Sequence, residues 1–135
     1  MLFGREHVET YRETGGDVGH EWQPGVYTLL LTTTGHASGQ PYTTPLIYRE
    51  ADGNYVVVAS KGGAPEDPDW YRNLEADPEV EIQVGPEVMP ATARTVEGAE
   101  RERLWSHMAE VWPDYDEYAQ KTVRRIPVVV LDPQR

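Results

Sequence analysis

The side chains best suited to chemistry in this sequence stand where an apolar run meets two glycines. Ser60 and Lys61 follow the end of the run at residues 55–59, and Gly62 and Gly63 come next. Glycine lets the backbone turn and approach a ligand closely. A hydroxyl, an ammonium group and backbone amides can then donate hydrogen bonds to an anionic or polar edge. This stretch predicts one wall of a site for a polar ligand.

A second loop combines glycine with hydroxyl groups in the same way. Residues 32–44 follow a predicted strand and contain Ser38, Thr43 and Thr44. Their hydroxyls and the nearby amides can hydrogen-bond a phosphate or the carbonyl groups of a heterocycle. Each loop alone is typical of an ordinary turn, and only the two together indicate a ligand site.

A pair of tyrosines supplies a third group. Tyr115 and Tyr118 are three residues apart on a short predicted helix, so both can face one pocket. Either hydroxyl can orient a substrate or hydrogen-bond an oxygen that gains negative charge, and Ser60 can serve as a further donor. These three residues are the predicted catalytic groups, with core packing as the alternative role of the tyrosines.

Composition excludes several other kinds of site. The chain has no cysteine, which leaves no thiolate nucleophile and no disulfide framework. It has no dinucleotide fingerprint or P-loop, and its four histidines are scattered, so no metal site is expected. The formal net charge of −11 disfavours nucleic acid. With no apolar stretch of membrane-spanning length, we expect a soluble, cytoplasmic protein.

The hydrophobic patterns predict a mainly β fold with peripheral helices. Pro45 places its strand at an edge or a bulge, Asp52-Gly53 predicts a hairpin, and the unbroken run Val56-Val57-Val58 should be covered on both faces. Strands and helices do not alternate regularly, which favours a small closed or partly open barrel over a doubly wound sheet. About six strands are expected, at residues 26–33, 42–49, 55–59, 80–84, 89–96 and 126–131.

Helix signals frame the later part of the chain. Asp67 is expected to cap a helix that starts at Pro68, and Asp114 with Glu117 has the spacing of a capping box. The longest helix is expected over residues 97–112. Residues 1–21 are expected to form an N-terminal arm or short helix, with a docking arm or frayed end preferred. Residues 22–135 are expected to form a single domain.

Seven short segments carry a family resemblance that runs in order from about residue 22 to the C-terminus. They are Thr-Thr-Gly-x-x-Ser-Gly at 33–39, Thr-Thr-Pro-Leu at 43–46, Ala-Ser-Lys-Gly-Gly-Ala at 59–64, Pro-x-Trp-Tyr-x-Asn-Leu at 68–74, Glu-Arg-x-x-x-Trp at 100–105, Pro-x-Tyr-x-x-Tyr at 113–118 and Arg-x-Ile-Pro-Val-Val-Val-Leu at 124–131. Each segment alone is a weak signal, but the combination is specific. In these segments the chain resembles the deazaflavin-dependent nitroreductase family.

This resemblance implies a split β-barrel of the FMN-binding-like type that binds coenzyme F420. It implies hydride transfer from the reduced cofactor to electron-poor molecules such as activated alkenes, quinones or nitro-heterocycles. The residues that it implies for cofactor binding are His36, Ala37, Ser38, Tyr42, Thr43, Thr44, Pro45, Leu46, Ile47, Val58, Ala59, Ser60, Lys61, Gly62, Gly63, Asp69, Trp70, Tyr71, Arg72, Asn73 and Tyr115.

The chain departs from this family where cations commonly hold the anionic tail of the cofactor. His36, Ala37 and Tyr42 stand at those positions. Either other cations hold the tail, or the affinity is low, or the cofactor is FMN, whose single phosphate needs fewer cations. The candidate substitutes are Lys61, Arg72, Arg124 and Arg125. An FMN-binding split-barrel oxidoreductase and a non-catalytic deazaflavin-binding protein are therefore the alternative functions, and the protein is expected to be a monomer or a homodimer.

Overall fold

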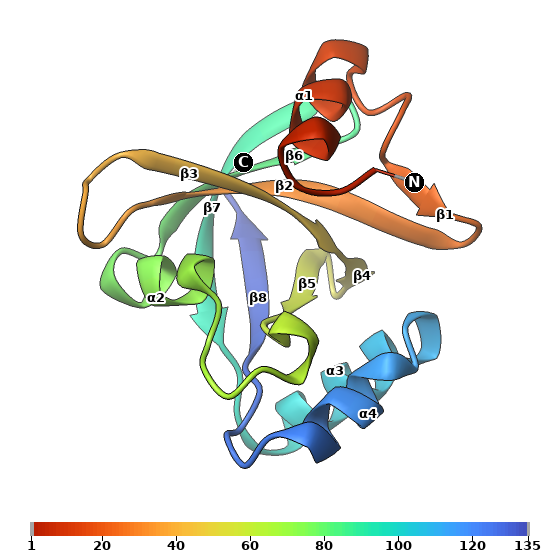
Figure 1. Ribbon diagram of the computed structural model, residues 1–135, viewed down its shortest axis with the longest axis vertical. Coiled ribbons are helices and arrows are strands. Elements are labelled where there is room, and N and C mark those ends of the chain that lie inside the picture. Colours follow the sequence, from red (N-terminus) through yellow and green to blue (C-terminus); the bar gives the residue numbers. More distant parts are fainter. Residues whose placement is uncertain (1, 135) are drawn as a thin grey trace.

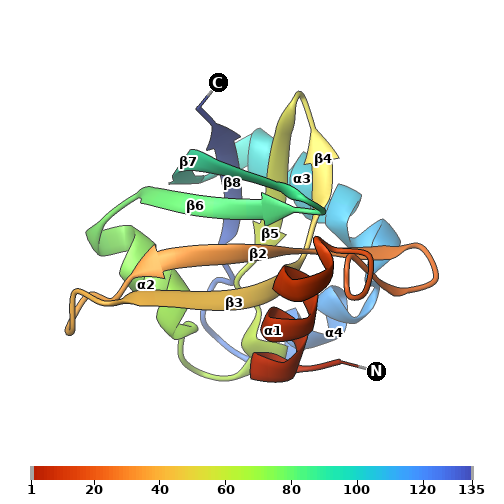
Figure 2. The same ribbon diagram turned by 90° about the horizontal axis from the view of Figure 1, so that it is seen from above.

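A computed structural model describes residues 2–134, which fold into a curved antiparallel sheet with helices around it (Figures 1 and 2). The strands follow the order β1-β2-β6-β7-β8-β5-β4, and β3 pairs with β2. The strands are β1 (Glu21–Gln23), β2 (Val26–Thr34), β3 (Pro41–Ile47), β4 (Arg49–Ala51), β5 (Asn54–Val58), β6 (Glu79–Val84), β7 (Glu87–Thr95) and β8 (Val128–Pro133). The helices are α1 (Gly4–Thr14), the short 3-10 helix η1 (Lys61–Gly63), α2 (Asp69–Ala76), α3 (Gly98–Val111) and α4 (Asp114–Lys121).

The sheet has eight strands among the described residues, not the six that were expected. The expected strand at 42–49 is divided, because β3 ends at Ile47, the buried Tyr48 follows, and β4 begins at Arg49. Strand β1 is additional. Both β1 and β4 have three residues, which is too short for an alternating hydrophobic pattern. They form because a neighbouring strand supplies their hydrogen-bond partners.

Strand β5 is covered on both faces, as its unbroken valine run predicts. Val57 packs inside the barrel with Leu29 of β2. Val56 and Val58 point the other way and pack with Leu104 of α3. The helices α3 and α4 therefore cover the outside of the sheet at β5, where the chain leaves the strand toward Ser60.

The predicted hairpin and the predicted edge are both confirmed. Asp52 and Gly53 join β4 to β5 with φ values of 56° and 81°, the pair of positive angles that a tight hairpin requires. Pro45 lies in β3, which pairs with β2 and with no other strand of residues 2–134. A proline is tolerated there because an edge strand does not need every N–H group for pairing.

The N-terminal segment is an anchored helix and not a frayed end. Tyr11 of α1 is fully buried and packs with Val8 and Leu30. Its hydroxyl accepts a hydrogen bond from the Gly85 amide at 2.7 Å and donates to the Thr28 carbonyl at 3.1 Å. These contacts fix α1 across the outer face of β2 and β3, as Figure 2 shows.

Two predicted helix caps are wrong. Helix α2 starts at Asp69 with Pro68 at its N-cap, and the Asp67 carboxylate forms an ion pair with Arg124 instead of capping. Helix α4 has Pro113 at its N-cap, and the apolar proline side chain makes no capping hydrogen bond. Asp114 falls inside the first turn, where its charge still favours the helix dipole. Helix α3 spans the expected region.

Candidate active site

One cavity of about 510 Å³ collects residues from the first and last parts of the chain. Its walls come from β3, from the turn after β5, from the start of α2, from α4 and from the N-terminal residues before α1. A second cavity, of about 610 Å³, lies between the β1–β2 turn and the end of α3 and contains none of the predicted site residues. We therefore take the first cavity as the candidate active site.

The cavity brings together thirteen of the predicted site residues. They are Tyr42, Thr44, Pro45, Leu46, Ile47, Val58, Ser60, Lys61, Gly62, Asp69, Trp70, Tyr115 and Tyr118. The other predicted residues are not part of this lining, and they are His36, Ala37, Ser38, Thr43, Ala59, Gly63, Tyr71, Arg72 and Asn73. All three predicted catalytic groups line the same cavity, although they are far apart in the sequence.

The turn after β5 runs through three successive residues with positive φ. Lys61, Gly62 and Gly63 have φ values of 46°, 62° and 84°. At Gly63 a side chain is also sterically excluded, because a Cβ atom there would lie 2.9 Å from the Tyr118 carbonyl oxygen. Lys61 is strained, since an L-residue with a side chain rarely adopts this conformation. The glycines therefore let the turn pass under α4 and form the cavity floor.

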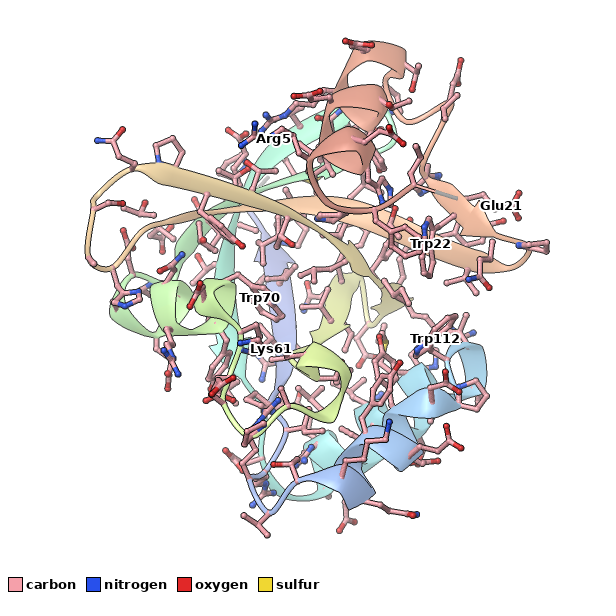
Figure 3. The ribbon with its side chains drawn as sticks, in the orientation of Figure 1. Arg5, Glu21, Trp22, Lys61, Trp70 and Trp112 are labelled. Atoms are coloured by element: carbon pink, nitrogen blue, oxygen red, sulfur yellow. The ribbon has the colours of Figure 1, made fainter. Side chains whose placement is uncertain are left out.

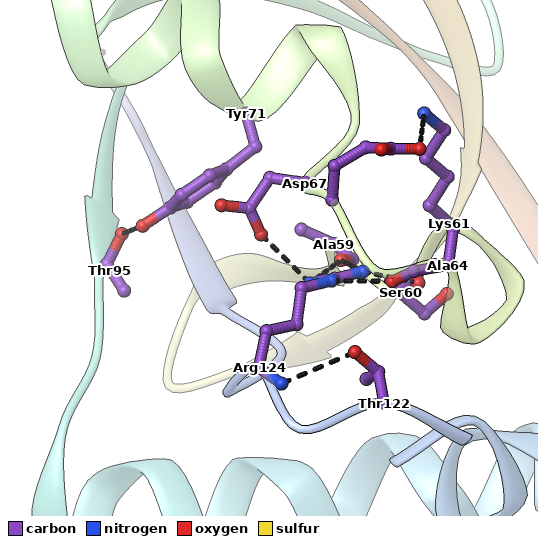
Figure 4. A network of polar contacts seen from close by, with 10 residues as sticks. Ala59, Ser60, Lys61, Ala64, Asp67, Tyr71, Thr95, Thr122 and Arg124 are labelled. Carbon is purple, nitrogen blue, oxygen red and sulfur yellow. Dashed lines mark hydrogen bonds and ion pairs between the residues drawn. The ribbon is translucent and has the colours of Figure 1, made fainter. Parts of the chain in front are cut away.

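Arg124 holds this turn in place from below (Figure 4). Its guanidinium donates to the Ser60 carbonyl at 2.7 Å, to the Ala64 carbonyl at 2.8 Å and to the Asp67 carboxylate at 2.8 Å. It also reaches the Ala59 carbonyl at 3.3 Å. The Arg124 side chain is only 13% exposed. Its donors are used inside the protein, so the suggestion that it binds an anionic tail is not supported.

The other suggested cations differ from one another, and Arg72 is outside the cavity lining. Arg125 pairs with Glu97 at 3.3 Å and lines a separate small cavity. Lys61 lines the candidate site and pairs with Glu66 at 3.3 Å, with about half of both side chains exposed. Lys61 is therefore the one suggested cation that reaches the cavity. Arg12 of α1 donates to the Thr43 hydroxyl at 2.9 Å, which adds a cation over β3 that no motif indicated.

His36 and Asn73 connect the β2–β3 loop to α2 through hydrogen bonds. The Asn73 side-chain oxygen accepts hydrogen bonds from the His36 backbone amide at 3.0 Å and from its Nδ1 at 2.6 Å. The Asn73 side-chain nitrogen donates to the Thr33 hydroxyl at 3.1 Å. Asn73 is 3% exposed, so its amide groups serve the fold. His36, which stands where the family commonly has a cation, therefore has a structural partner in Asn73.

Six side-chain polar groups on the cavity wall have no hydrogen-bond partner within residues 2–134. They are the hydroxyls of Tyr42, Thr44, Ser60 and Tyr115, the carboxylate of Asp69 and the indole N–H of Trp70. The Tyr115 side chain is almost fully buried, and this burial, with the nearby Tyr118, raises the pKa of its hydroxyl above the ordinary value of 10.0. At neutral pH Tyr115 is therefore a protonated O–H group that can donate into the cavity.

One end of the cavity is aromatic, and part of it is formed by residues that no motif indicates. Trp22 of β1 and Phe3 before α1 line the cavity beside Trp112 and Tyr118. The Trp112 indole N–H donates to the Tyr118 hydroxyl at 3.4 Å. The only available signal was the presence of large aromatic residues near the N-terminus, which does not show where they point.

Comparisons with known proteins identify the family of the chain. The family model described as F420H(2)-dependent quinone reductase matches residues 2–133. An F420H(2)-dependent quinone reductase of Mycobacterium tuberculosis H37Rv is 45% identical over 130 residues, which cover 94% of this chain and 87% of that protein. The solved structure of an F420-H2 dependent reductase, FDR-A, is 47% identical with a TM-score of 0.72, over 78% of this chain and 93% of that one.

Other solved structures extend the likeness of the fold. One described as a domain-swapped dimer is 44% identical with a TM-score of 0.75, over 95% of this chain and 96% of that chain. The heme storage protein HutZ from Vibrio cholerae is 17% identical with a TM-score of 0.64, over 99% of this chain and 92% of that one. That distant likeness shows the fold alone, a split β-barrel. By its family match and its close relatives, this chain belongs to the F420H(2)-dependent quinone reductase family.

Proposed function

We propose that this protein is an F420H2-dependent reductase that passes a hydride to quinones. The observation that carries the proposal is the shared cavity, in which the Ser60–Lys61 turn faces Tyr115 and Tyr118. Its volume of about 510 Å³ lies within the usual range for cofactor and substrate sites. The family membership of the chain supports the choice of cofactor.

The residues present fit the ring of a deazaflavin better than its anionic tail. Thr44, Ser60 and Trp70 offer donors without partners among the described residues, as the polar edges of a heterocycle require. For the tail, Lys61 reaches the cavity and already faces Glu66. In a chain of net charge −11, we expect tail contacts to add little affinity.

When bound, the reduced cofactor supplies a hydride from its deazaflavin ring. We assign to Tyr115 the task of donating a hydrogen bond to the quinone oxygen, on which negative charge develops during reduction. A donor fixed in a buried, poorly hydrated position stabilises such charge more than water does. Tyr118 orients the substrate beside Tyr115, with the two rings 6.2 Å apart. Ser60 and the amides of its turn hold the polar edge of the reactants.

Titration of the purified protein with F420 and, separately, with FMN tests the cofactor assignment. Binding is followed by the fluorescence of each cofactor. We expect saturable F420 binding that weakens only slightly as salt rises, because few cations face the tail. Tight FMN binding with no response to F420 would refute the proposal and favour an FMN-dependent oxidoreductase.

Two coarser features complete the proposal. The described residues 2–134 contain no helix that is long and apolar enough to cross a membrane, and we propose that the enzyme acts in the cytoplasm. We further propose a homodimer, in keeping with the similar structure described as a domain-swapped dimer. Light scattering coupled to gel filtration measures the mass in solution, and a mass of one chain of 15.3 kDa would contradict the dimer.

A further inference from the structure

The two ends of the candidate active site differ in chemistry. Lys61 and Trp70 lie at one end, and Ser60, which precedes Lys61 in the chain, adds a hydroxyl there. Trp22 and Trp112 lie at the other end, and Figure 3 shows these two pairs on different sides of the site. Because the donors for a polar cofactor edge gather at the first end, the aromatic end is left for the substrate.

Trp22 joins elements that are distant in the sequence. Its ring centroid lies 5.7 Å from that of Trp112, at the end of α3, with an angle of 47° between the rings. The Phe3 ring meets Trp22 edge-on at 5.6 Å. The Trp22 indole N–H donates to the Leu2 carbonyl at 2.7 Å. Three rings from β1, α3 and the N-terminal segment thus form a continuous aromatic wall at this end.

We propose that Trp22 determines which quinones the enzyme accepts. With Trp112 it forms an angled wall against which a planar ring can pack, and a fused second ring gains contact area there that a single ring does not. This inference rests on the proposed function, because it concerns the substrate end of the same cavity. The inference adds a preference of the reductase for two-ring quinones. It assigns that preference to Trp22, which lies outside every motif of the chain.

The competing role for Trp22 is structural. Its hydrogen bond to Leu2 and its contact with Phe3 could serve only to fix the N-terminal segment. The two roles make different predictions, since phenylalanine at position 22 keeps an aromatic face but cannot donate to the Leu2 carbonyl. If Trp22 provides a packing surface for the quinone, Trp22→Phe keeps the quinone affinity that Trp22→Ala loses. If Trp22 only fixes the N-terminal segment, both variants lose that function.

The test measures quinone binding to protein loaded with oxidised F420, so that no turnover occurs. The two probes are menadione, which has two fused rings, and duroquinone, which has one ring. Calorimetry gives the dissociation constants, and the chain has no cysteine that could react with a quinone. In Trp22→Ala we expect the dissociation constant of menadione to rise roughly 2- to 12-fold, the range that an aromatic pair contributes. That of duroquinone should change less, and Trp22→Phe should restore most of the menadione affinity.

Tyr27→Ala is the matched control. Tyr27 pairs with Glu21 of β1 and is 40% exposed, but it lies outside the candidate active site, so its loss tests the effect of loosening the same hairpin. The control should leave both dissociation constants unchanged. Equal weakening of both quinones in Trp22→Ala, or failure of Trp22→Phe to restore menadione binding, would overturn the inference while the reductase proposal stands. Absence of F420 binding by the unmodified protein would overturn both.

Discussion

Replacing Arg124 should loosen the turn that forms the cavity floor. Arg124→Ala removes the guanidinium that ties the Ser60 and Ala64 carbonyls to Asp67. Breaking a buried ion pair costs about 3–5 kcal/mol, and because Asp67 is 32% exposed we discount this to about 2–3 kcal/mol. For a chain of this length, the loss corresponds to a fall in the melting temperature of roughly 6–15 °C. Lys61 would also be freer to leave its strained conformation, with φ of 46°.

Urea unfolding and thermal unfolding measure this loss, and F420 titration measures the effect on the site. The stability of Arg124→Lys should lie between those of the unmodified protein and Arg124→Ala, since a single ammonium cannot reproduce the planar guanidinium that donates to several acceptors. Arg125→Ala is the matched control, because the neighbouring Arg125 pairs with Glu97 while both side chains are well exposed. It should change the free energy of unfolding by no more than about 0.5 kcal/mol. If Arg124→Ala unfolds like Arg125→Ala and keeps its F420 affinity, the reasoning about the clamp is wrong.

Three further predictions follow from single contacts. Burial lowers the pKa of His7 below its ordinary value of 6.5. The contribution of His7 to folding stability is therefore full above pH 6.5 and is lost as the pH falls below that value. Urea unfolding at several pH values should show this dependence, and the same dependence in a His7→Gln variant would contradict the prediction. Gly63→Ala should destabilise more than Gly62→Ala, because both positions have positive φ but only a Cβ at Gly63 meets backbone, 2.9 Å from a carbonyl oxygen; equal melting temperatures would refute the steric argument. Tyr115→Phe should lower kcat by roughly 10²-fold with little change in F420 affinity, whereas Tyr27→Phe should leave kcat unaltered; an unchanged kcat in Tyr115→Phe would remove the proposed donor.

Local rules predicted the parts of the fold that local residues determine. The Asp52-Gly53 hairpin and the edge position of Pro45 are confirmed because each follows from the backbone limits of one or two residues. The double burial of Val57 and its neighbours is confirmed because an unbroken apolar run cannot leave one face in water.

Features that depend on distant partners could not be predicted in this way. The cap expected at Asp67 is wrong because Arg124, 57 residues away, takes its carboxylate. The strands β1 and β4 exist through pairing with neighbours and have no pattern of their own. The same holds for the site: the motifs predicted the turn at Ser60 and the tyrosines of α4, but the position of Trp22 depends on the packing of β1 against the end of α3.

The most direct test of the central claim is the rate at which the purified protein oxidises F420H2 in the presence of menadione, followed by the return of deazaflavin absorbance. We predict a rate that saturates with both F420H2 and the quinone, that requires the protein, and that falls sharply in Tyr115→Phe. Absence of quinone-dependent F420H2 oxidation, with F420 shown to be bound, would contradict the assignment as a reductase and leave a protein that only binds the cofactor.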